Sequence, residues 1–104
     1  MDSKNSTVSG NLLQQILFIQ SDNGCSLLVL RDRKQCILEH SLAELESLLP
    51  PSRFYRVHRS YIVNMTAVSE FRYFRKQLLA VMEGYRIPIS RRRKRIVMES
   101  LEMV

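Results

Sequence analysis

Residues 53–64 read RFYRVHRSYIVN and combine a β-strand pattern with a cluster of cations. Aromatic and β-branched residues, which favour strands, flank a polar centre at His58, Arg59 and Ser60. A second segment, IPISRRRKR at 87–95, ends a predicted strand and then places five cations in a row. Two β-hairpin signals lie between these segments. We therefore expect a compact fold to bring both segments to one surface that attracts a polyanion.

The positive charge of the chain is confined to its second half. The net charge is +6, but residues 1–52 contain four Lys or Arg and six Asp or Glu, whereas residues 53–104 contain twelve and four. The first half therefore carries −2 and the second half +8. A field concentrated in this way indicates an acidic partner, most often nucleic acid, with a solvated arginine-rich surface as the alternative.

Length and composition describe one globular domain of 104 residues, 45% hydrophobic and 25% charged. Residues 1–11 are polar and aperiodic and are expected to form a disordered or tag-like lead, so the domain is predicted at 12–104. No apolar run reaches the ~20 residues that span a bilayer, and the N-terminus lacks the core of a signal peptide. We therefore expect a cytoplasmic protein without membrane insertion.

The order of the local signals predicts a mostly β fold. Short β-branched and aromatic runs are separated by turn signals, among them Asn23-Gly24 and Glu83-Gly84. Pro88 places the last strand at the edge of a sheet. The predicted strands are Ile16–Gln20, Cys25–Leu30, Gln35–Leu38, Phe54–Val57, Tyr61–Val63, Val68–Phe74, Leu78–Met82 and Tyr85–Ile89.

After the predicted strands, the spacing of the apolar residues becomes helical, which predicts a short helix at Leu42–Leu49, within residues 41–49. Ser41 and Glu44 have the spacing of a capping box, and Pro50-Pro51 stops the helix. The leucines of this segment recur at helical spacing and are all expected to close the core. They are Leu42, Leu45, Leu48 and Leu49.

A second helix is predicted near 91–102, with Ser90 as its cap. Its apolar face is expected at Ile96, Val97 and Leu101, with Val104 as a further candidate. The five cations at its start oppose the helix dipole, which costs about 0.3–1 kcal/mol for each charge. A bound phosphate would reverse this penalty, which favours nucleic acid over a solvated charge run or a membrane-surface patch.

The sequence offers no sign of catalysis or of metal binding. Its two histidines are His40 and His58, and neither a glycine-rich phosphate loop nor a nucleophile–base pair is visible. His58 lies among arginines, which favours a structural or nucleic-acid-contacting role over a general base. Cys25 and Cys36 are expected to be reduced thiols on neighbouring strands, with a redox switch as the alternative. We therefore expect no enzyme, no metal and no cofactor.

Residue chemistry alone leaves three binding functions open: DNA, RNA or an acidic protein partner. The four tyrosines offer rings for base stacking, as RNA-binding sheets do, but no RNP-like or GxxG motif accompanies them. Signatures of a helix-turn-helix, a zinc finger or a basic zipper are also missing. The composition by itself therefore predicts a basic, mostly β, nucleic-acid-binding module.

Two motifs resemble the signatures of LytTR DNA-binding domains. Residues 54–64, FYRVHRSYIVN, are similar to F-x-R-V-H-R-S-Y-x-V-N, and residues 84–92, GYRIPISRR, are similar to G-x-x-I-P-V-S-R-R. The resemblance covers about residues 12–102. It implies an elongated, mostly β fold of small antiparallel sheets, and a bacterial transcription regulator such as the output domain of a two-component response regulator.

The resemblance also implies a mode of binding. In this family, loops enter the major groove at successive turns of double-stranded DNA and contact the minor groove between them. Two copies bind paired imperfect direct repeats and bend the DNA. Members commonly follow a receiver domain, for which 104 residues leave no room. Control by a missing receiver domain or by a separate inhibitory protein is therefore expected.

By motif position, the resemblance implies base contacts from Arg59, Arg91 and the Asn23–Ser26 turn, in which Asn23 and Ser26 are the candidate side chains. Arginine suits this role because it can bond bidentately to guanine. Asn64 is expected to fix a turn rather than touch DNA. Other positions are expected to contact phosphates or to support the loops: His58, Ser60, Ser90, Arg92 and Lys94.

Overall fold

The computed structural model describes residues 12–102 and shows eight β-strands with short helices. The lead predicted at 1–11 and the last two residues of the predicted domain lie outside this part. The strands are β1 (Ile16–Asp22), β2 (Cys25–Leu30), β3 (Gln35–Leu38), β4 (Phe54–His58), β5 (Tyr61–Asn64), β6 (Glu70–Phe74), β7 (Gln77–Met82) and β8 (Tyr85–Ile89). Helices α2 (Leu42–Leu48) and α3 (Arg91–Glu102) follow β3 and β8, residues 12–15 before β1 are also helical, and 3-10 turns lie at Arg31–Arg33 and Met65–Ala67.

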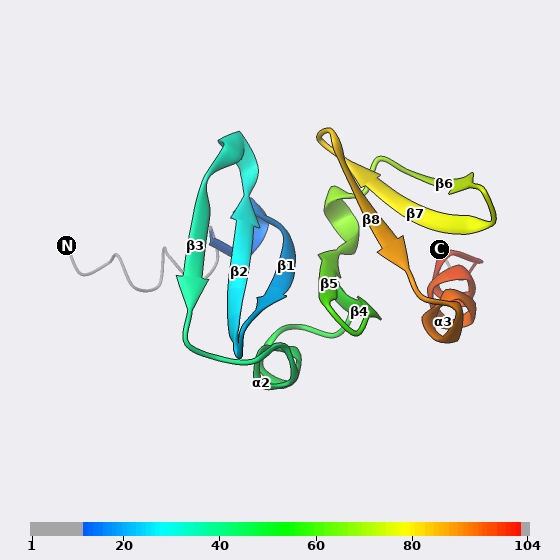
Figure 1. Cartoon of the computed structure of the whole chain (residues 1–104). Helices are drawn as coiled ribbons and strands as arrows, with labels where there is room; N and C mark the ends of the chain where they lie inside the picture. The colour runs from blue at the N-terminus through cyan, green and yellow to red at the C-terminus, as the bar shows by residue number, and fades with distance from the viewer. Residues whose placement is uncertain (1–11, 103–104) are drawn as a thin grey trace.

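The strands form two antiparallel sheets, as the sequence predicted. One sheet has the order β3-β2-β1-β5-β4, and the other has the order β6-β7-β8. Figure 1 shows the five-stranded sheet with α2 below it, and the three-stranded sheet beside α3 at the other end of the molecule. The extents of 47 × 32 × 25 Å make the fold elongated. Pro88 lies on β8, an edge strand, because a proline cannot donate to a further ladder.

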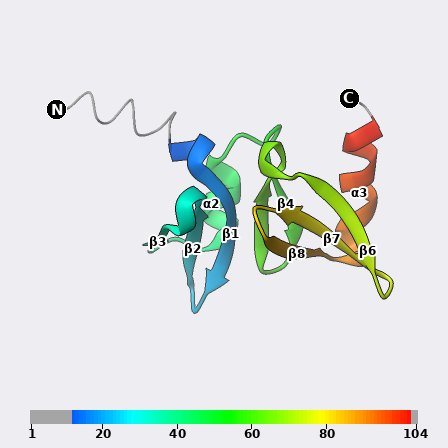
Figure 2. The same ribbon diagram turned by 90° about the horizontal axis from the view of Figure 1, so that it is seen from above.

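Both faces of the five-stranded sheet are covered, which explains the unbroken apolar run at the start of β1. Ile19 belongs to a cluster that α2 covers, whereas Phe18 belongs to a cluster shared with the three-stranded sheet and α3. A bulge between Ile16 and Phe18 inserts Leu17, which is fully buried. In Figure 2 the second layer, β6 to β8 with α3, lies on the side of β4 away from β1 to β3.

The capping signals predicted for the N-terminal ends of α2 and α3 are confirmed. The Ser41 hydroxyl accepts from the Glu44 amide at 3.1 Å, and the Glu44 carboxylate accepts from the Ser41 amide at 2.7 Å. This capture of a backbone amide lowers the pKa of Glu44. The Ser90 hydroxyl accepts from the Arg93 amide at 3.3 Å and so begins α3. Gly84 has φ +87°, as its turn into β8 requires.

The predicted apolar faces of the two helices are only partly correct. Leu48 is 72% exposed, because at 100° per residue it lies about 120° around the helix from Leu42. On α3, Val97 is buried, but Ile96 and Leu101 are exposed, since only one narrow side of this helix meets the sheet. Within residues 12–102 no helix is both long and apolar enough to cross a bilayer.

The strand register argues against a redox switch between the two cysteines. Cys36 on β3 lies opposite Leu28 on β2, and Cys25 is three positions further along β2. Three positions correspond to about 10 Å and to opposite faces of the sheet. A disulfide needs Cα atoms within about 7 Å. Both cysteines are free thiols, which agrees with the prediction of reduced thiols on neighbouring strands.

Candidate nucleic-acid interface

Two of the predicted contact loops lie at the same end of the five-stranded sheet. Asn23-Gly24 connects β1 to β2, and Arg59-Ser60 connects β4 to β5. The Ser21 amide donates to the Ser60 carbonyl at 3.0 Å, which fixes the two turns next to each other. Asn23 and Gly24 have φ of 50° and 87°, values that Asn and Gly accept more readily than other residues.

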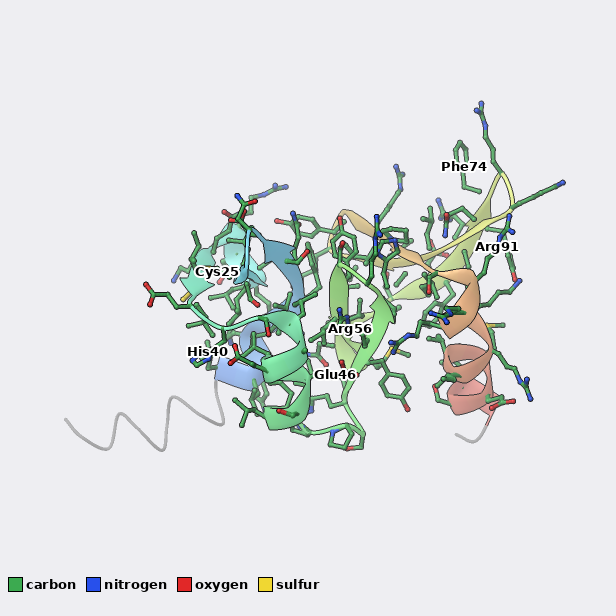
Figure 3. All side chains as sticks on the ribbon, turned by 60° about the horizontal axis from the view of Figure 1, so that its bottom comes forward. Cys25, His40, Glu46, Arg56, Phe74 and Arg91 are labelled. Atoms are coloured by element: carbon green, nitrogen blue, oxygen red, sulfur yellow. The ribbon has the colours of Figure 1, made fainter. Side chains whose placement is uncertain are left out.

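The Arg56 side chain braces the turn that carries Arg59. Its Nε donates to the His58 carbonyl at 2.9 Å, and its Nη2 donates to the Arg59 carbonyl at 2.6 Å. Its Nη1 pairs with Glu46 Oε1 of α2 at 3.0 Å, and Figure 3 shows the two residues side by side. The Arg56 side chain is only 16% exposed. The backbone of this turn is therefore held before any ligand arrives, while the Arg59 side chain points to solvent.

Backbone and side-chain hydrogen bonds join the second signature segment to the first. The Ser90 amide, at the end of β8, donates to the Val57 carbonyl of β4 at 2.8 Å. Arg93 Nη1 of α3 donates to the Arg56 carbonyl at 3.0 Å. The start of α3 is thus attached to the strand that carries the Arg59 turn. The two segments, far apart in sequence, form one surface.

Two hollows lie on this surface, and His58 and Ser90 line both of them. The smaller, of about 280 Å³, is lined by Arg56, His58, Arg59, Ser90, Arg92 and Arg93. The larger, of about 580 Å³, is lined by His58, Arg75, Lys76, Gln77, Leu78, Ile89, Ser90, Arg91 and Lys94. Every ionisable group in these linings is an arginine, a lysine or the histidine. Such a concentration of positive charge favours a polyanionic ligand.

The cations at the start of α3 divide into anchored and exposed groups. Arg93 bonds to β4, Arg95 pairs with Glu99, and Lys94 lies over the Tyr73 ring at 4.7 Å. Arg91 and Arg92 are exposed, and neither pairs with a carboxylate among residues 12–102. These two guanidinium groups, next to the amides of a helix N-terminus, are placed to receive an anion.

The surroundings of His58 favour the neutral form of its ring. Burial lowers its pKa below 6.5, and the neighbouring charges of Arg59 and Arg56 lower the pKa further. Its Nδ1 accepts from the Ser60 amide at 3.1 Å. In a neutral ring the proton then sits on Nε2, and His58 also lines both hollows. His58 thus holds the backbone amide of Ser60 in the Arg59 turn.

Ser26 is not accessible on this surface, contrary to its predicted role as a base contact. It is fully buried, and its hydroxyl donates to the His40 carbonyl at 2.6 Å. The Ser26 hydroxyl therefore binds the backbone just before α2 and does not face a ligand. Asn23 in the same turn is exposed, so it alone of the two is accessible.

Asn64 has the turn-fixing role that was predicted for it. It is fully buried, and its amide donates to the Ile16 carbonyl at 2.8 Å. Its Oδ1 accepts from the backbone amide and the hydroxyl of Thr66 at 3.1 and 2.8 Å. Every polar atom of this buried side chain that needs a partner is therefore engaged within the protein.

The structure gathers most of the predicted residues around the two hollows and adds others that the sequence reading missed. The predicted residues that line them are His58, Arg59, Ser90, Arg91, Arg92 and Lys94. The missed residues are Arg56, Arg75, Lys76 and Arg93. Arg56 lay inside the quoted motif, and Arg75-Lys76 was visible as a cationic turn between two strands, so both signals were present in the sequence.

The sequence and the fold of this chain are similar to those of known DNA-binding domains. The family model described as the LytTr DNA-binding domain matches residues 11–102. The chain belongs to the LytTR DNA-binding domain family. A solved structure of the LytTr DNA-binding domain of a protein from Bacillus cereus superposes with a TM-score of 0.77, at 24% identity, over 86% of this chain and 83% of that one. That likeness confirms the two-sheet LytTR fold.

A curated relative of this LytTR domain is also known. The chain is 48% identical over 54 residues to the CO-responsive transcriptional regulator RcoM of Rhodospirillum rubrum. The match covers 49% of this chain and 23% of RcoM, so it spans under a quarter of that regulator's length. The LytTR domain is a non-catalytic, DNA-binding domain, which agrees with the expectation that this chain is not an enzyme.

Proposed function

We propose that this LytTR domain binds double-stranded DNA sequence-specifically and serves a bacterial transcription regulator, two copies binding paired imperfect direct repeats. The observation that carries the proposal is the cationic surface formed by the Arg59-Ser60 turn and the start of α3. A backbone bond from the Ser90 amide to the Val57 carbonyl and a side-chain bond from Arg93 to the Arg56 carbonyl fix its two halves to each other. A surface held in this way loses little entropy when DNA binds.

In this proposal, exposed arginines at two separate points read bases. Arg59 extends from a braced turn, and Arg91 begins α3. Each guanidinium can donate two hydrogen bonds to O6 and N7 of a guanine. Asn23, in the neighbouring turn, adds an amide that suits adenine. The long axis of 47 Å exceeds the ~34 Å of one DNA turn, so one domain is long enough to cover more than a turn of DNA.

The remaining polar residues of this surface bind phosphates or hold the loops. Phosphate contacts fix the position of a protein on DNA but carry no base preference of their own. The residues proposed for this role are His58, Ser60, Ser90, Arg92 and Lys94. The similarity to RcoM supports a role in transcription regulation. We propose that an attached receiver domain or a separate inhibitory protein controls the domain.

Selection of bound sequences from a random duplex pool tests this function. The domain is incubated at near-physiological salt with excess nonspecific competitor, and bound duplexes are sequenced. We expect enrichment of two short repeats at a fixed spacing. An unenriched pool with steep salt dependence would reduce the function to phosphate binding. Equal competition by duplex RNA, or a tight complex with an acidic protein that survives nuclease, would point to the other two functions.

A matched pair of α3 variants tests the division between base and phosphate contacts. Arg91→Ala is expected to relax base preference at one position of the site, by about 1–3 kcal/mol. Lys94→Ala, which removes the same charge from the same helix, is expected to weaken binding to selected and scrambled duplexes alike. If Arg91→Ala also weakened both duplexes by one factor, Arg91 would not read a base.

A further inference from the structure

The β6–β7 hairpin carries cations at its tip that no motif of the family assigned. In Figures 1 and 2 the tip lies at the end of the molecule farthest from β3. Its two turn residues are Arg75 and Lys76, and their φ angles are 51° and 68°. Two-residue turns of this kind favour Asn and Gly, because other side chains are strained in the left-handed region. Stability alone therefore does not explain an Arg-Lys pair in this turn.

The tip is fixed relative to the proposed base-reading surface. The Gln77 side chain donates to the Ile89 carbonyl at 2.9 Å and to the Leu78 carbonyl at 3.2 Å, which ties the start of β7 to the end of β8. Lys94 of α3 lies over the Tyr73 ring at 4.7 Å. The tip therefore holds a set position next to the N-terminus of α3.

Aromatic rings stiffen the tip itself. Arg75 lies over the Phe74 ring at 5.2 Å, and both Phe74 and Tyr73 are more than half exposed. Figure 3 shows Phe74 at the outer end of the hairpin, beyond Arg91 of α3. A cation over a ring face is attracted to it by about 0.5–1 kcal/mol at an exposed site, which favours one position for the Arg75 side chain. Arg75 is therefore held at the tip of the hairpin, where it lines a hollow shared with α3.

Tip and helix together line one cationic hollow. Arg75 and Lys76 contribute from the tip, and Arg91 and Lys94 contribute from α3, to the hollow of about 580 Å³. No carboxylate lines this hollow. The acid nearest in sequence to the tip, Glu70 at the far end of β6, is already paired with Arg72. Four cations around one opening fit a run of phosphates better than a single small anion.

We propose that the β6–β7 tip is a phosphate clamp, in which Arg75 and Lys76 bind the DNA backbone beside the groove that Arg91 enters. The proposal rests on the proposed DNA-binding function and extends its footprint. The clamp contacts the flank away from the Arg59 turn, because the tip projects beyond α3. It holds the duplex against Arg91 and carries no base preference of its own.

The test removes the two charges without disturbing the hairpin. In Arg75→Asn/Lys76→Gly, the turn receives the residues that its backbone favours, so the variant is expected to unfold at the same or a higher temperature. Its affinity for selected and scrambled duplexes is expected to fall by the same factor, about tenfold. The slope of log K against log salt should shrink by about 1.8, the value for two phosphates.

A control pair removes two cations elsewhere. Arg33→Ala/Lys34→Ala lies in the β2–β3 connection, at the opposite end of β2 from the Asn23-Gly24 turn. This variant is expected to keep nearly the wild-type slope. A hydroxyl-radical footprint should lose protection at one flank only for the tip variant. An unchanged slope and footprint in the tip variant, or a loss confined to selected DNA, would overturn the clamp.

The outcomes separate this proposal from the function on which it rests. Wild-type domain that fails to enrich any sequence overturns the proposed function before the tip is tested. Wild-type domain that enriches repeats, together with a tip variant that binds as the wild type does, overturns only the clamp. Phe74→Ala serves as a third variant: a slope unchanged from wild type is expected, because the ring orients Arg75 but carries no charge.

Discussion

The β1–β2 turn and the β4–β5 turn lie next to each other at one end of the same sheet, yet they are built in different ways. Asn23-Gly24 relies on residues that accept positive φ, and its nearest charged residue is Asp22. The Arg59-Ser60 turn is held by the Arg56 fork and by His58. We therefore expect the two turns to contribute unequally to DNA binding, because only the second turn combines a cation with a brace.

Removing the cation from the second turn should have the largest effect. We expect Arg59→Ala to reduce the preference for selected over scrambled duplex by about 1–3 kcal/mol, since a bidentate contact to guanine is lost. Competition binding with duplexes changed at single positions measures this preference. Loss of preference at every position equally, or at none, would contradict a base-reading role for Arg59.

Breaking the brace should have the next largest effect. Arg56→Lys keeps a cation near Glu46 but loses the planar fork that holds two carbonyls, so preference should fall by about 1 kcal/mol. Glu46→Gln leaves both carbonyl contacts and should change preference less. The same binding assay is repeated in a double-mutant cycle. If Arg56→Lys lowers preference just as much when Arg59 is already alanine, the brace does not act through Arg59.

The pH dependence of stability should distinguish the two turns in a smaller way. The folded state lowers the pKa of His58 below the value of about 6.5 expected in the unfolded chain. The neutral ring is therefore favoured by folding, and the free energy of unfolding is greatest above pH 6.5 and decreases as the pH falls through 6.5 towards the folded pKa. Urea unfolding at pH 7.5 and 5.5 measures this change.

Two histidine variants identify the source of that pH dependence. His58→Gln should flatten the profile between pH 7.5 and 5.5, whereas His40→Gln, at an exposed site before α2, serves as the matched control. A profile that keeps its slope in His58→Gln would show that another group is responsible. The Asn23-Gly24 turn offers no histidine, so it should not contribute.

The smallest effect is expected at the first turn. Asn23→Gly retains a residue that accepts φ of 50° and removes only the side-chain amide. One neutral hydrogen bond contributes about 0.5–1.5 kcal/mol net, so the preference for selected over scrambled duplex should fall by no more than this amount. Competition binding beside Arg59→Ala gives the comparison directly. A loss of preference as large as that of Arg59→Ala would show that the two turns contribute equally to base recognition.

The sequence by itself determined most of the strands, the capping box at Ser41 and Glu44, and the turn at Gly84. These features depend on contacts within a few residues, so residue type and spacing are sufficient to specify them. The two quoted motifs also identified the family and pointed to the turn at Arg59 and to the start of α3 at Arg91. Charge distribution correctly indicated which half of the chain is cationic.

Only the tertiary structure decided which of these side chains face a ligand. Ser26 and Leu48 were misjudged because burial depends on which face another element covers, and local sequence does not contain that information. The link between Val57 and Ser90, and the bond from Arg93 to Arg56, join residues more than thirty positions apart. The cationic surface exists because long-range packing of two sheets and α3 brings separate segments together, and no single segment specifies that arrangement.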